Sequence, residues 1–299
     1  MSALFQKLTN KAAFKEIEYV KKPLDVAVQT IADWKEARES ALATVSPLRS
    51  PLMVSYEKAL LDAHLVALIR ARKAPTTGAD FELLNASGEV DQEATEKAAE
   101  FIDEFFSLVI DGVFWGSQNI QIDSVDEYGV PKFSAMRRRN LEPFSRRFLK
   151  DETQYSEGVD YTKSRYKNYL VCMDSDPYDL GLLNIAVPYS IILKALTGNW
   201  ATGSERAGVP TVIAKTDISN MQAVAQLKQG LEAFAKNPKM ILDNTDVIEV
   251  LPNSGDVYQV YRELASFVEA NLSKLILGST MTTDDGSSRS QSEVHERTT

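Results

Sequence analysis

Five arginines form the most concentrated basic patch of this sequence, Arg137-Arg138-Arg139 and Arg146-Arg147. Because guanidinium groups attract phosphate, contact with phosphate is one function that the patch could have. A solvated or partner-facing strand edge explains it equally well, since edge strands often carry charge that blocks further pairing. The chain has a formal net charge of −9, which argues against tight neutralisation of many phosphates but is compatible with DNA that slides past.

Three carboxylates, Asp174, Asp176 and Asp179, lie within six residues of one another. This density could hold a calcium ion, but we prefer a turn followed by an N-terminal cap for the next helix. The two histidines, His64 and His295, are far apart and lack the cysteine or carboxylate spacing of a zinc site. We therefore predict no metal and no other cofactor.

Nucleophilic and nucleotide-dependent chemistry find little support in the sequence. Cys172 is the one cysteine and lies in an apolar run, so we expect a buried small side chain rather than a nucleophile. The segment 198–204 has the glycine spacing of a phosphate loop but lacks the lysine before Ser204. We find no Ser-His-Asp arrangement, no paired catalytic carboxylates and no nucleophile elbow. Together these observations predict that the protein is not an enzyme.

Composition indicates a globular protein with a real core, because 44% of its 299 residues are hydrophobic. No window of roughly 20 apolar residues stands out, and the N-terminus lacks the apolar core and cleavage site of a secretory signal. We therefore expect no membrane partner and a protein that stays in the cytosol where it is made.

Capping residues and apolar periodicity predict the helices that position the candidate residues in the first half of the chain. An arm with a short helix near 23–38 comes first, and a helix then begins at Ser50-Pro51 and continues to about Lys73. His64 falls on the leucine side of that helix, which predicts a packed structural histidine. Another helix begins at Asp91 and carries an apolar stripe as far as Leu108.

Strands complete an α+β unit over the first 175 residues. Alternation predicts a hairpin of antiparallel strands, and a short apolar run and two more strands surround it. These segments are 81–84, 113–122, 130–136, 144–149 and 167–173.

The second half reads as two long helices around a small α/β lobe. The first helix spans 180–206 with a kink at Pro188, and the second spans 256–277 and stops at Gly278. We expect the second helix to pack through Val257, Val260, Leu264, Phe267, Asn271 and Leu275. The lobe should contain strands at 211–215, 239–242 and 247–251 and a helix at 219–236 that opens with a capping box.

Several segments in this half, taken in order, resemble phage portal proteins of the Mu-like type. The run from Asp176 to Tyr189 resembles the start of a long helix in that family, and 204–210 resembles the segment before a strand. Leu272 to Gly278 and Ser288 to Glu296 continue the similarity. From 50 to 121 the order of helix, strand, helix and strand also fits a portal wing. No single motif is specific, but the ordered set is.

The resemblance implies a portal-like α+β wing, two long stem helices and a small α/β clip inserted between them. On this sequence the expected divisions are an N-terminal arm at 1–48, the wing at 49–175, the first stem helix at 176–207, the clip at 208–252, the second stem helix at 253–278, and a tunnel loop with the start of a further helix at 279–299. That last helix is nearly absent, so the resemblance also implies a C-terminally truncated form that assembles poorly.

The implied function is structural: a homo-oligomeric ring, commonly of twelve subunits, that forms the DNA channel at one capsid vertex for genome packaging and head–tail joining. Implied partners are the packaging ATPase (large terminase), a head–tail adaptor, capsid or scaffold protein, and double-stranded DNA held without sequence preference. The protein would belong to the virion after assembly in the host cytoplasm. The acidic loop residues expected to face DNA are Thr282, Thr283, Asp284, Asp285 and Gly286.

Two other interpretations stay open at the level of sequence. One is a different head–tail adaptor or minor capsid protein with the same long-helix layout, which electron micrographs of a ring that recruits the packaging ATPase would distinguish. The other is an enzyme that acts on nucleic acid, which nuclease or nucleotide-hydrolysis activity would reveal. Neither has a motif that supports it.

Overall fold

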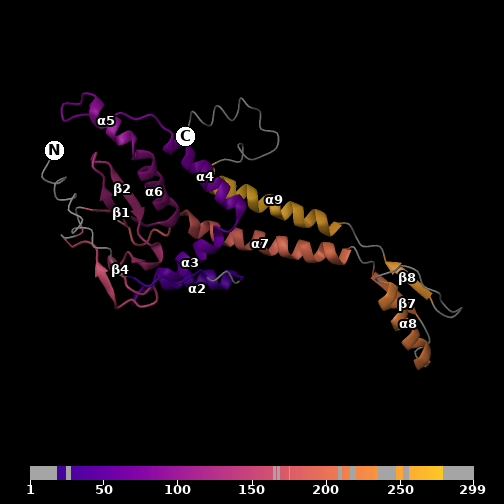
Figure 1. Ribbon diagram of the computed structural model, residues 1–299. Helices are drawn as coiled ribbons and strands as arrows, with labels where there is room; N and C mark the ends of the chain where they lie inside the picture. The colour runs from indigo at the N-terminus through magenta and orange to yellow at the C-terminus, as the bar shows by residue number, and fades with distance from the viewer. Residues whose placement is uncertain are drawn as a thin grey trace. The chain divides into compact units, whose positions relative to one another are not determined.

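A computed structural model describes residues 19–24, 28–163, 166, 169–174, 176–207, 211–215, 220–234, 247–251 and 256–278 (Figure 1). The chain forms two compact units. Unit 1 comprises Met1–Ile192 and Val268–Thr299, and unit 2 comprises Leu193–Phe267. The long helix α7 (Gly181–Ala207) leaves unit 1 for unit 2, and α9 (Asp256–Leu277) returns.

Caps set the helix boundaries at the start of unit 1. Helix α2 (Ile31–Ala41) begins later than the expected 23–38, because Thr30 and Asp33 form a capping box. The helix expected from Ser50 to Lys73 is two helices, α3 (Ser50–Ala59) and α4 (Ala63–Thr77). The cause is Asp62, whose Oδ1 accepts from the backbone N–H of His64 at 2.9 Å and so starts a new helix.

The next expected helix is also divided. Helix α5 (Gln92–Ala99) and helix α6 (Ile102–Trp115) are separated at Glu100 and Phe101. The apolar run at 81–84 forms no strand and contributes only an isolated bridge from Leu84 to Val90. The order helix, strand, helix and strand expected over 50–121 is therefore wrong, because four helices precede the first strand there.

Two three-stranded antiparallel sheets lie in unit 1, with strand orders β2-β1-β6 and β3-β4-β5. Their strands are β1 (Gln118–Val125), β2 (Pro131–Ala135), β3 (Leu141–Glu142), β4 (Arg147–Leu149), β5 (Gly158–Asp160) and β6 (Leu170–Met173). The hairpin prediction is confirmed by β1 and β2, although β1 starts at Gln118 because α6 continues to Trp115. Helix α6 contacts β1 and β2, and α4 contacts α6 (Figure 1).

Unit 2 contains an antiparallel pair of strands and one helix between them in sequence. Strands β7 (Thr211–Lys215) and β8 (Val247–Leu251) have the predicted bounds, and α8 (Met221–Phe234) is slightly shorter than predicted. Asn220 caps α8, since its Oδ1 accepts from the N–H of Gln222 at 3.2 Å. Ser219, where the expected capping box begins, lies outside the described residues. The expected strand at 239–242 lies outside the described residues.

Helix α9 packs through a different stripe from the one expected. Val268, Leu272 and Ile276 are buried and Tyr261 and Ala265 are half-buried, each one position C-terminal to a residue of the predicted set. Asn271 and Leu275 of the predicted set are half-buried as well. Val260, Leu264 and Phe267, which were expected to pack, are exposed. The sequence could not decide between the two stripes because both are largely apolar.

Helix α7 is long and apolar enough over Gly181–Thr202 to cross a membrane, with a mean hydropathy of 1.3. The expectation that no such segment exists was wrong by this criterion. Core helices of soluble proteins pass the same test, and Leu183, Ala186, Val187 and Ser190 of α7 are buried in the protein. The finding is therefore weak support for a membrane span.

Two glycines join the end of α6 to the start of α7. Gly116 and Gly181 both adopt left-handed φ values, 75° and 70°. A Cβ on Gly181 would lie 2.3 Å from the backbone N of Gly116 and the carbonyl O of Phe114, and a Cβ on Gly116 would lie 2.5 Å from the carbonyl O of Asp179. Only glycine fits at either position, because both the conformation and the space exclude a side chain.

We predict that Gly181→Ala lowers the free energy of unfolding by about 3 kcal/mol or more, since it adds a backbone clash to the left-handed penalty. The matched control is Gly88→Ala, where φ is 83° but nothing lies within 4 Å. That variant should lose only about 1 kcal/mol. Urea unfolding at equilibrium measures both, and equal losses would contradict the close approach.

Candidate functional site

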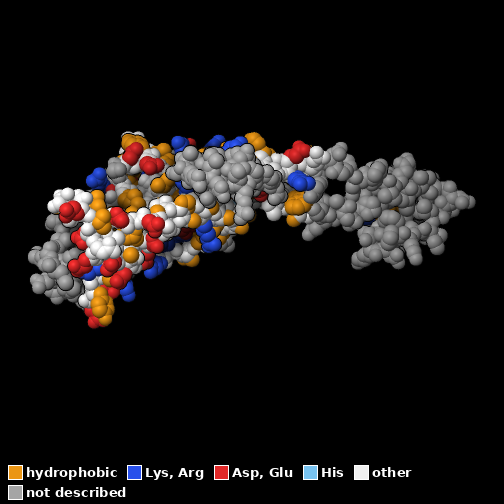
Figure 2. All heavy atoms as spheres, turned by 90° about the horizontal axis from the view of Figure 1, so that it is seen from above, with side chains coloured by type: hydrophobic (Ala, Val, Ile, Leu, Met, Phe, Trp, Pro, Cys, Tyr) orange, Lys and Arg blue, Asp and Glu red, His pale blue; other side chains and the backbone are white. Residues whose placement is uncertain are grey.

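The basic patch is divided between the interior and the surface of unit 1. Arg138 and Arg139 form the 3₁₀ turn η1 (Arg138–Asn140) between β2 and β3, and Arg137 precedes it. The side chains of all three make contacts within the chain. Arg147, half-buried at the start of β4, donates to the carbonyl of Ser156 at 3.5 Å, and Arg146 is exposed. On the face drawn in Figure 2, Lys and Arg side chains are scattered among Asp and Glu and do not form one continuous basic surface.

Arg139 is the most buried member, with 3% of its side chain exposed. Its guanidinium pairs with both carboxylate oxygens of Glu57 on α3, and Nη1 lies 3.5 Å from Oε1 of buried Glu152. Burial opposes the charge, but the hydrogen bonds and charge of Glu57 outweigh it and raise the pKa of Arg139. Arg137 reaches the same Glu152 at 3.1 Å and donates to the carbonyl of Lys22 at 2.8 Å.

Arg138 holds the opposite side of the turn. Its Nε donates to Oε1 of Gln118 at 2.7 Å, and its Nη2 donates to Oδ2 of Asp111 on α6 at 2.9 Å. Asp111 also accepts from Nζ of Lys73 on α4 at 2.7 Å. The guanidinium carbon lies 4.4 Å from the ring centroid of Trp115, within cation–π range. Burial lowers the pKa of Arg138, and the charge of Asp111 works against that shift.

These contacts give Arg137, Arg138 and Arg139 a structural role that the sequence did not reveal. They tie α3, α4, α6 and the segment near Lys22 to one turn. Contact with phosphate or a partner protein stays a prediction for the patch, and Arg146 and Arg147 are its members nearest to solvent. The carboxylates were missed because Glu57 is 82 residues from Arg139, a separation that local patterns cannot span.

We predict that Arg139→Met lowers the free energy of unfolding by about 3–5 kcal/mol, because it leaves buried Glu152 and partly buried Glu57 without this cation. The control Arg146→Met removes the same charge from an exposed position and should change stability by less than about 0.5 kcal/mol. Thermal and urea unfolding monitored by circular dichroism provide the comparison. Similar losses in both variants would refute the buried network.

A second polar cluster holds the start of α7. Arg49, which is 1% exposed, donates through Nη2 to the carbonyls of Pro177 at 3.2 Å and Asp179 at 2.8 Å. Tyr56 on α3 donates its hydroxyl to the carbonyl of Leu180 at 2.7 Å. These three carbonyl oxygens precede α7 and lie outside its regular hydrogen bonds. The side chains of Arg49, which is the N-cap of α3, and Tyr56 therefore fix where α7 begins.

The acidic cluster before α7 behaves as a turn and a cap. Oδ1 of Asp176 accepts from the N–H of Tyr178, and Oδ1 of Asp179 accepts from the N–H of Gly181, each at 2.8 Å. Asp174 is buried and accepts a hydrogen bond from the Tyr161 hydroxyl instead. Among the residues that the structure describes, no group of three or more His, Cys, Asp or Glu side chains is placed to hold a metal.

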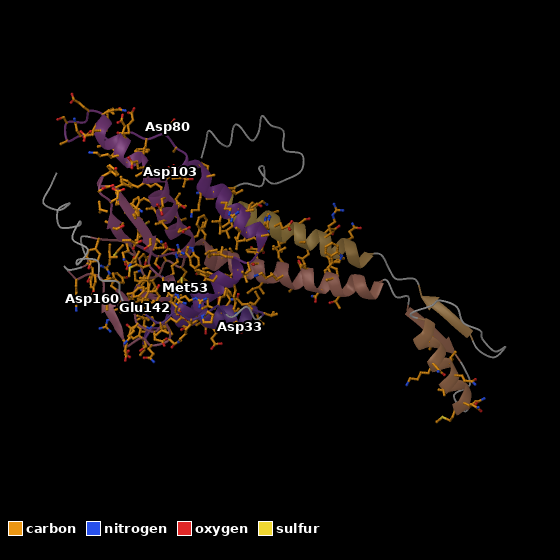
Figure 3. The ribbon with its side chains drawn as sticks, viewed as in Figure 1. Asp33, Met53, Asp80, Asp103, Glu142 and Asp160 are labelled. Carbon is orange, nitrogen blue, oxygen red and sulfur yellow. The ribbon has the colours of Figure 1, made fainter. Side chains whose placement is uncertain are left out.

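Glu142 on β3 is fully buried and lies among the side chains that fill unit 1 (Figure 3). Desolvation raises its pKa to about 7, and hydrogen bonds from the N–H groups of Arg49, at 3.0 Å, and Phe144 only partly oppose the shift. Because the Glu142 carboxyl loses its proton near neutral pH while buried, the free energy of unfolding should depend on pH in that range.

The pKa of Glu142 is higher in the folded state than the usual 4.5, so its stabilising contribution is complete below pH 4.5 and is lost as pH rises through 7. We predict that the free energy of unfolding of the wild type falls between pH 5 and pH 8. The fall should be smaller by roughly 3 kcal/mol in Glu142→Gln, which has no carboxyl at this position. Urea midpoints at both pH values test this. Glu157→Gln, at an exposed carboxylate, should leave the wild-type difference unchanged.

Two further candidates differ in outcome. Cys172 is exposed, so the expectation of a buried cysteine was wrong; it lies on β6, where alternation places it on the outer side. Partial desolvation nevertheless raises the pKa of its thiol to about 11, which disfavours a reactive thiolate. His64 is half-buried, and its Nε2 lies 3.4 Å from the carbonyl of Glu269 on α9, a structural contact.

The residues expected to face DNA, Thr282, Thr283, Asp284, Asp285 and Gly286, and the further helix expected to start within 279–299, lie outside the described residues. Their expected roles therefore stay predictions.

Comparison with known proteins identifies the class. The model of a family described as the portal protein of Mu bacteriophage matches residues 53–299, which is most of the chain. The chain is therefore a phage portal protein. It belongs to the Mu-type portal family, whose members are structural, non-enzymatic components of the virion, and portal proteins form oligomeric rings in phage capsids.

Solved structures add a distant likeness. The chain is similar to a crystal structure of an HK97-family phage portal protein from Corynebacterium diphtheriae, with 11% sequence identity and a TM-score of 0.41. The match covers 73% of this chain and 75% of that one. At these values it adds nothing to the family assignment. No curated protein matches the sequence.

Proposed function

We propose that this portal protein forms the DNA channel at one capsid vertex, through which the genome is packaged and to which the tail is joined. The observation that carries the proposal is the family match over 53–299. The contacts of the described residues agree with a structural role, because the arginine cluster and the Arg49 cluster both serve to fix helices.

We assign the parts of a portal subunit to segments of the chain in the order in which they occur. Unit 1 contains the wing, α7 and α9 are the stem helices, and the strands and helix between them form the clip. Support comes from the way α7 leaves unit 1 and α9 returns to it, with the β7-α8-β8 elements between them in sequence. The clip would meet the packaging ATPase, and the wing would meet capsid or scaffold protein.

The loop after α9 is proposed to face the DNA. Gly278, with a φ of 80°, ends the helix, and the acidic residues that follow would repel phosphate and prevent tight binding. Double-stranded DNA would therefore pass without sequence preference. A head–tail adaptor would join the same ring after packaging, and assembly would take place in the host cytoplasm.

We predict that Asp284→Lys with Asp285→Lys reduces DNA packaging at least about tenfold, because a cationic loop would hold the sliding duplex. Packaged DNA that survives nuclease treatment of assembled heads is the measurement. The matched control is Glu93→Lys with Glu96→Lys, which makes the same change of charge on exposed positions of α5. Packaging at the wild-type level in the loop variant would contradict the proposal that this loop faces DNA in the channel.

A further inference from the structure

Arg146 has an unusual backbone conformation for an arginine. Its φ is 50°, in the left-handed region, and it ends the turn that joins β3 to β4. Its N–H donates to the carbonyl of Pro143 at 3.3 Å, and its own carbonyl accepts from the N–H of Tyr161 at 3.3 Å. The left-handed region is unfavourable for a residue with a Cβ, whereas glycine enters it freely. Glycine at position 146 would therefore make this turn more stable.

The side chain of Arg146 makes no contact that offsets this strain. It is exposed, and it forms no hydrogen bond or ion pair with the part of the chain that the structure describes. Arg137, Arg138 and Arg139, in contrast, all pair with carboxylates of the same chain. Strained residues cluster at sites where function requires them, so a strained residue with an idle side chain is a candidate for binding. The guanidinium of Arg146 is accordingly available to a partner.

Two more cations gather beside this turn. Arg147 is opposite Asp160 in the register of β4 and β5, and Lys163 is exposed in the turn that follows β5. The carboxylate of Asp160, which is labelled in Figure 3, accepts from the N–H and the hydroxyl of Thr162 at 2.9 Å and 2.7 Å. These bonds lower the pKa of Asp160, and the charges of Lys163 and Arg147 add to the shift. Both cations therefore lie near a carboxylate that its own turn already holds.

An exposed aromatic ring borders the cations. Tyr178 is 69% exposed, and its ring packs edge to face on Phe144, in the same turn as Arg146, with 5.0 Å between the centroids. We call the surface formed by Arg146, Arg147, Lys163 and Tyr178 the Arg146 surface. Its cations can pair with anionic groups of a partner, and its ring can supply apolar contact.

The size and charge of the Arg146 surface favour a short acidic protein segment over DNA. Guanidinium groups bind carboxylates through paired hydrogen bonds, so a few carboxylates are enough to occupy the surface. Duplex DNA requires a longer basic track. The chain has a net charge of −9, and on the face in Figure 2 Lys and Arg side chains are mixed with Asp and Glu.

We propose that the Arg146 surface binds a short acidic segment of the capsid protein. The surface lies in unit 1, the part of the chain that contains the wing in the proposed function. The choice of the capsid protein rests on that proposed function, whereas the acidic chemistry of the partner rests on the surface itself. The strained arginine then serves assembly of the head rather than the fold of the subunit.

A fluorescein-labelled octaglutamate peptide, followed by fluorescence anisotropy at low ionic strength, tests the chemistry. Arg146→Gly should weaken binding of the peptide at least about fivefold, because it removes a charge-assisted contact. The same variant should raise the urea midpoint of unfolding, because it removes the left-handed strain. Lys35→Gln, at an exposed cation of α2, should change neither value. Equal weakening in both variants, or none in Arg146→Gly, overturns the surface.

A DNA duplex of about 20 base pairs is measured in the same way, because DNA is the competing partner. We expect weak binding that Arg146→Gly leaves unchanged. A duplex that binds more tightly than the peptide and is lost in Arg146→Gly would overturn the acidic protein segment in favour of nucleic acid.

The portal content of assembled heads tests the partner. Arg146→Gly with Lys163→Gln should lower the amount of portal protein in purified heads at least about fivefold by immunoblot, and Lys35→Gln should not. Circular dichroism and mass photometry report the fold and the ring of each variant. Loss of the ring in the double variant would assign the surface to a neighbouring subunit and overturn the proposal.

Failure of the partner and failure of the portal function give different results. Normal portal content in the double variant overturns the capsid partner and leaves the portal function standing. Heads that never contain the wild-type protein overturn both.

Discussion

Burial of the Arg49 guanidinium against the carbonyls of Pro177 and Asp179 decides where the long helix α7 starts. A cation so deeply buried needs acceptors for its donors. The loop before α7 supplies two carbonyls for Nη2 of Arg49, whereas its Nε and Nη1 have no hydrogen-bond partner among the described residues. The same point is held by the Tyr56 hydroxyl and by the contact between two glycine backbones. The direction in which α7 leaves unit 1 therefore depends on polar bonds as much as on apolar packing.

The Arg137–Arg139 turn extends this principle to the rest of unit 1. Short strands and short helices bury little apolar surface each, so a network of guanidinium and carboxylate groups joins them across long separations in sequence. Such networks specify an arrangement because each partner left alone would be a buried charge. An acidic chain can thus contain a cluster of arginines whose side chains mostly pair with carboxylates and carbonyls of the same chain.

The element boundaries that were predicted correctly are those set by local sequence patterns. Strands β7 and β8 and helix α9 have the predicted bounds, since alternation, caps and Gly278 are read within a few residues. The break at Asp62 was missed because its cap competes with a continuous apolar stripe. The break at Phe101 has no side-chain cap, so no local pattern marks it. The partners of Arg139 and the exposure of Cys172 were missed because they depend on which distant elements meet. The family followed from the order of segments rather than from any one residue.

The two stripes of α9 also bear on how the helix can change in evolution. Inserting one residue near Phe267 would rotate everything after it by about 100° and exchange the roles of the stripes beyond that point. Asn271 and Leu275 would then take the buried places of Leu272 and Ile276, so a polar side chain would enter the interior of unit 1. The length of α9 before Val268 is therefore constrained by the packing of the unit to which the chain returns.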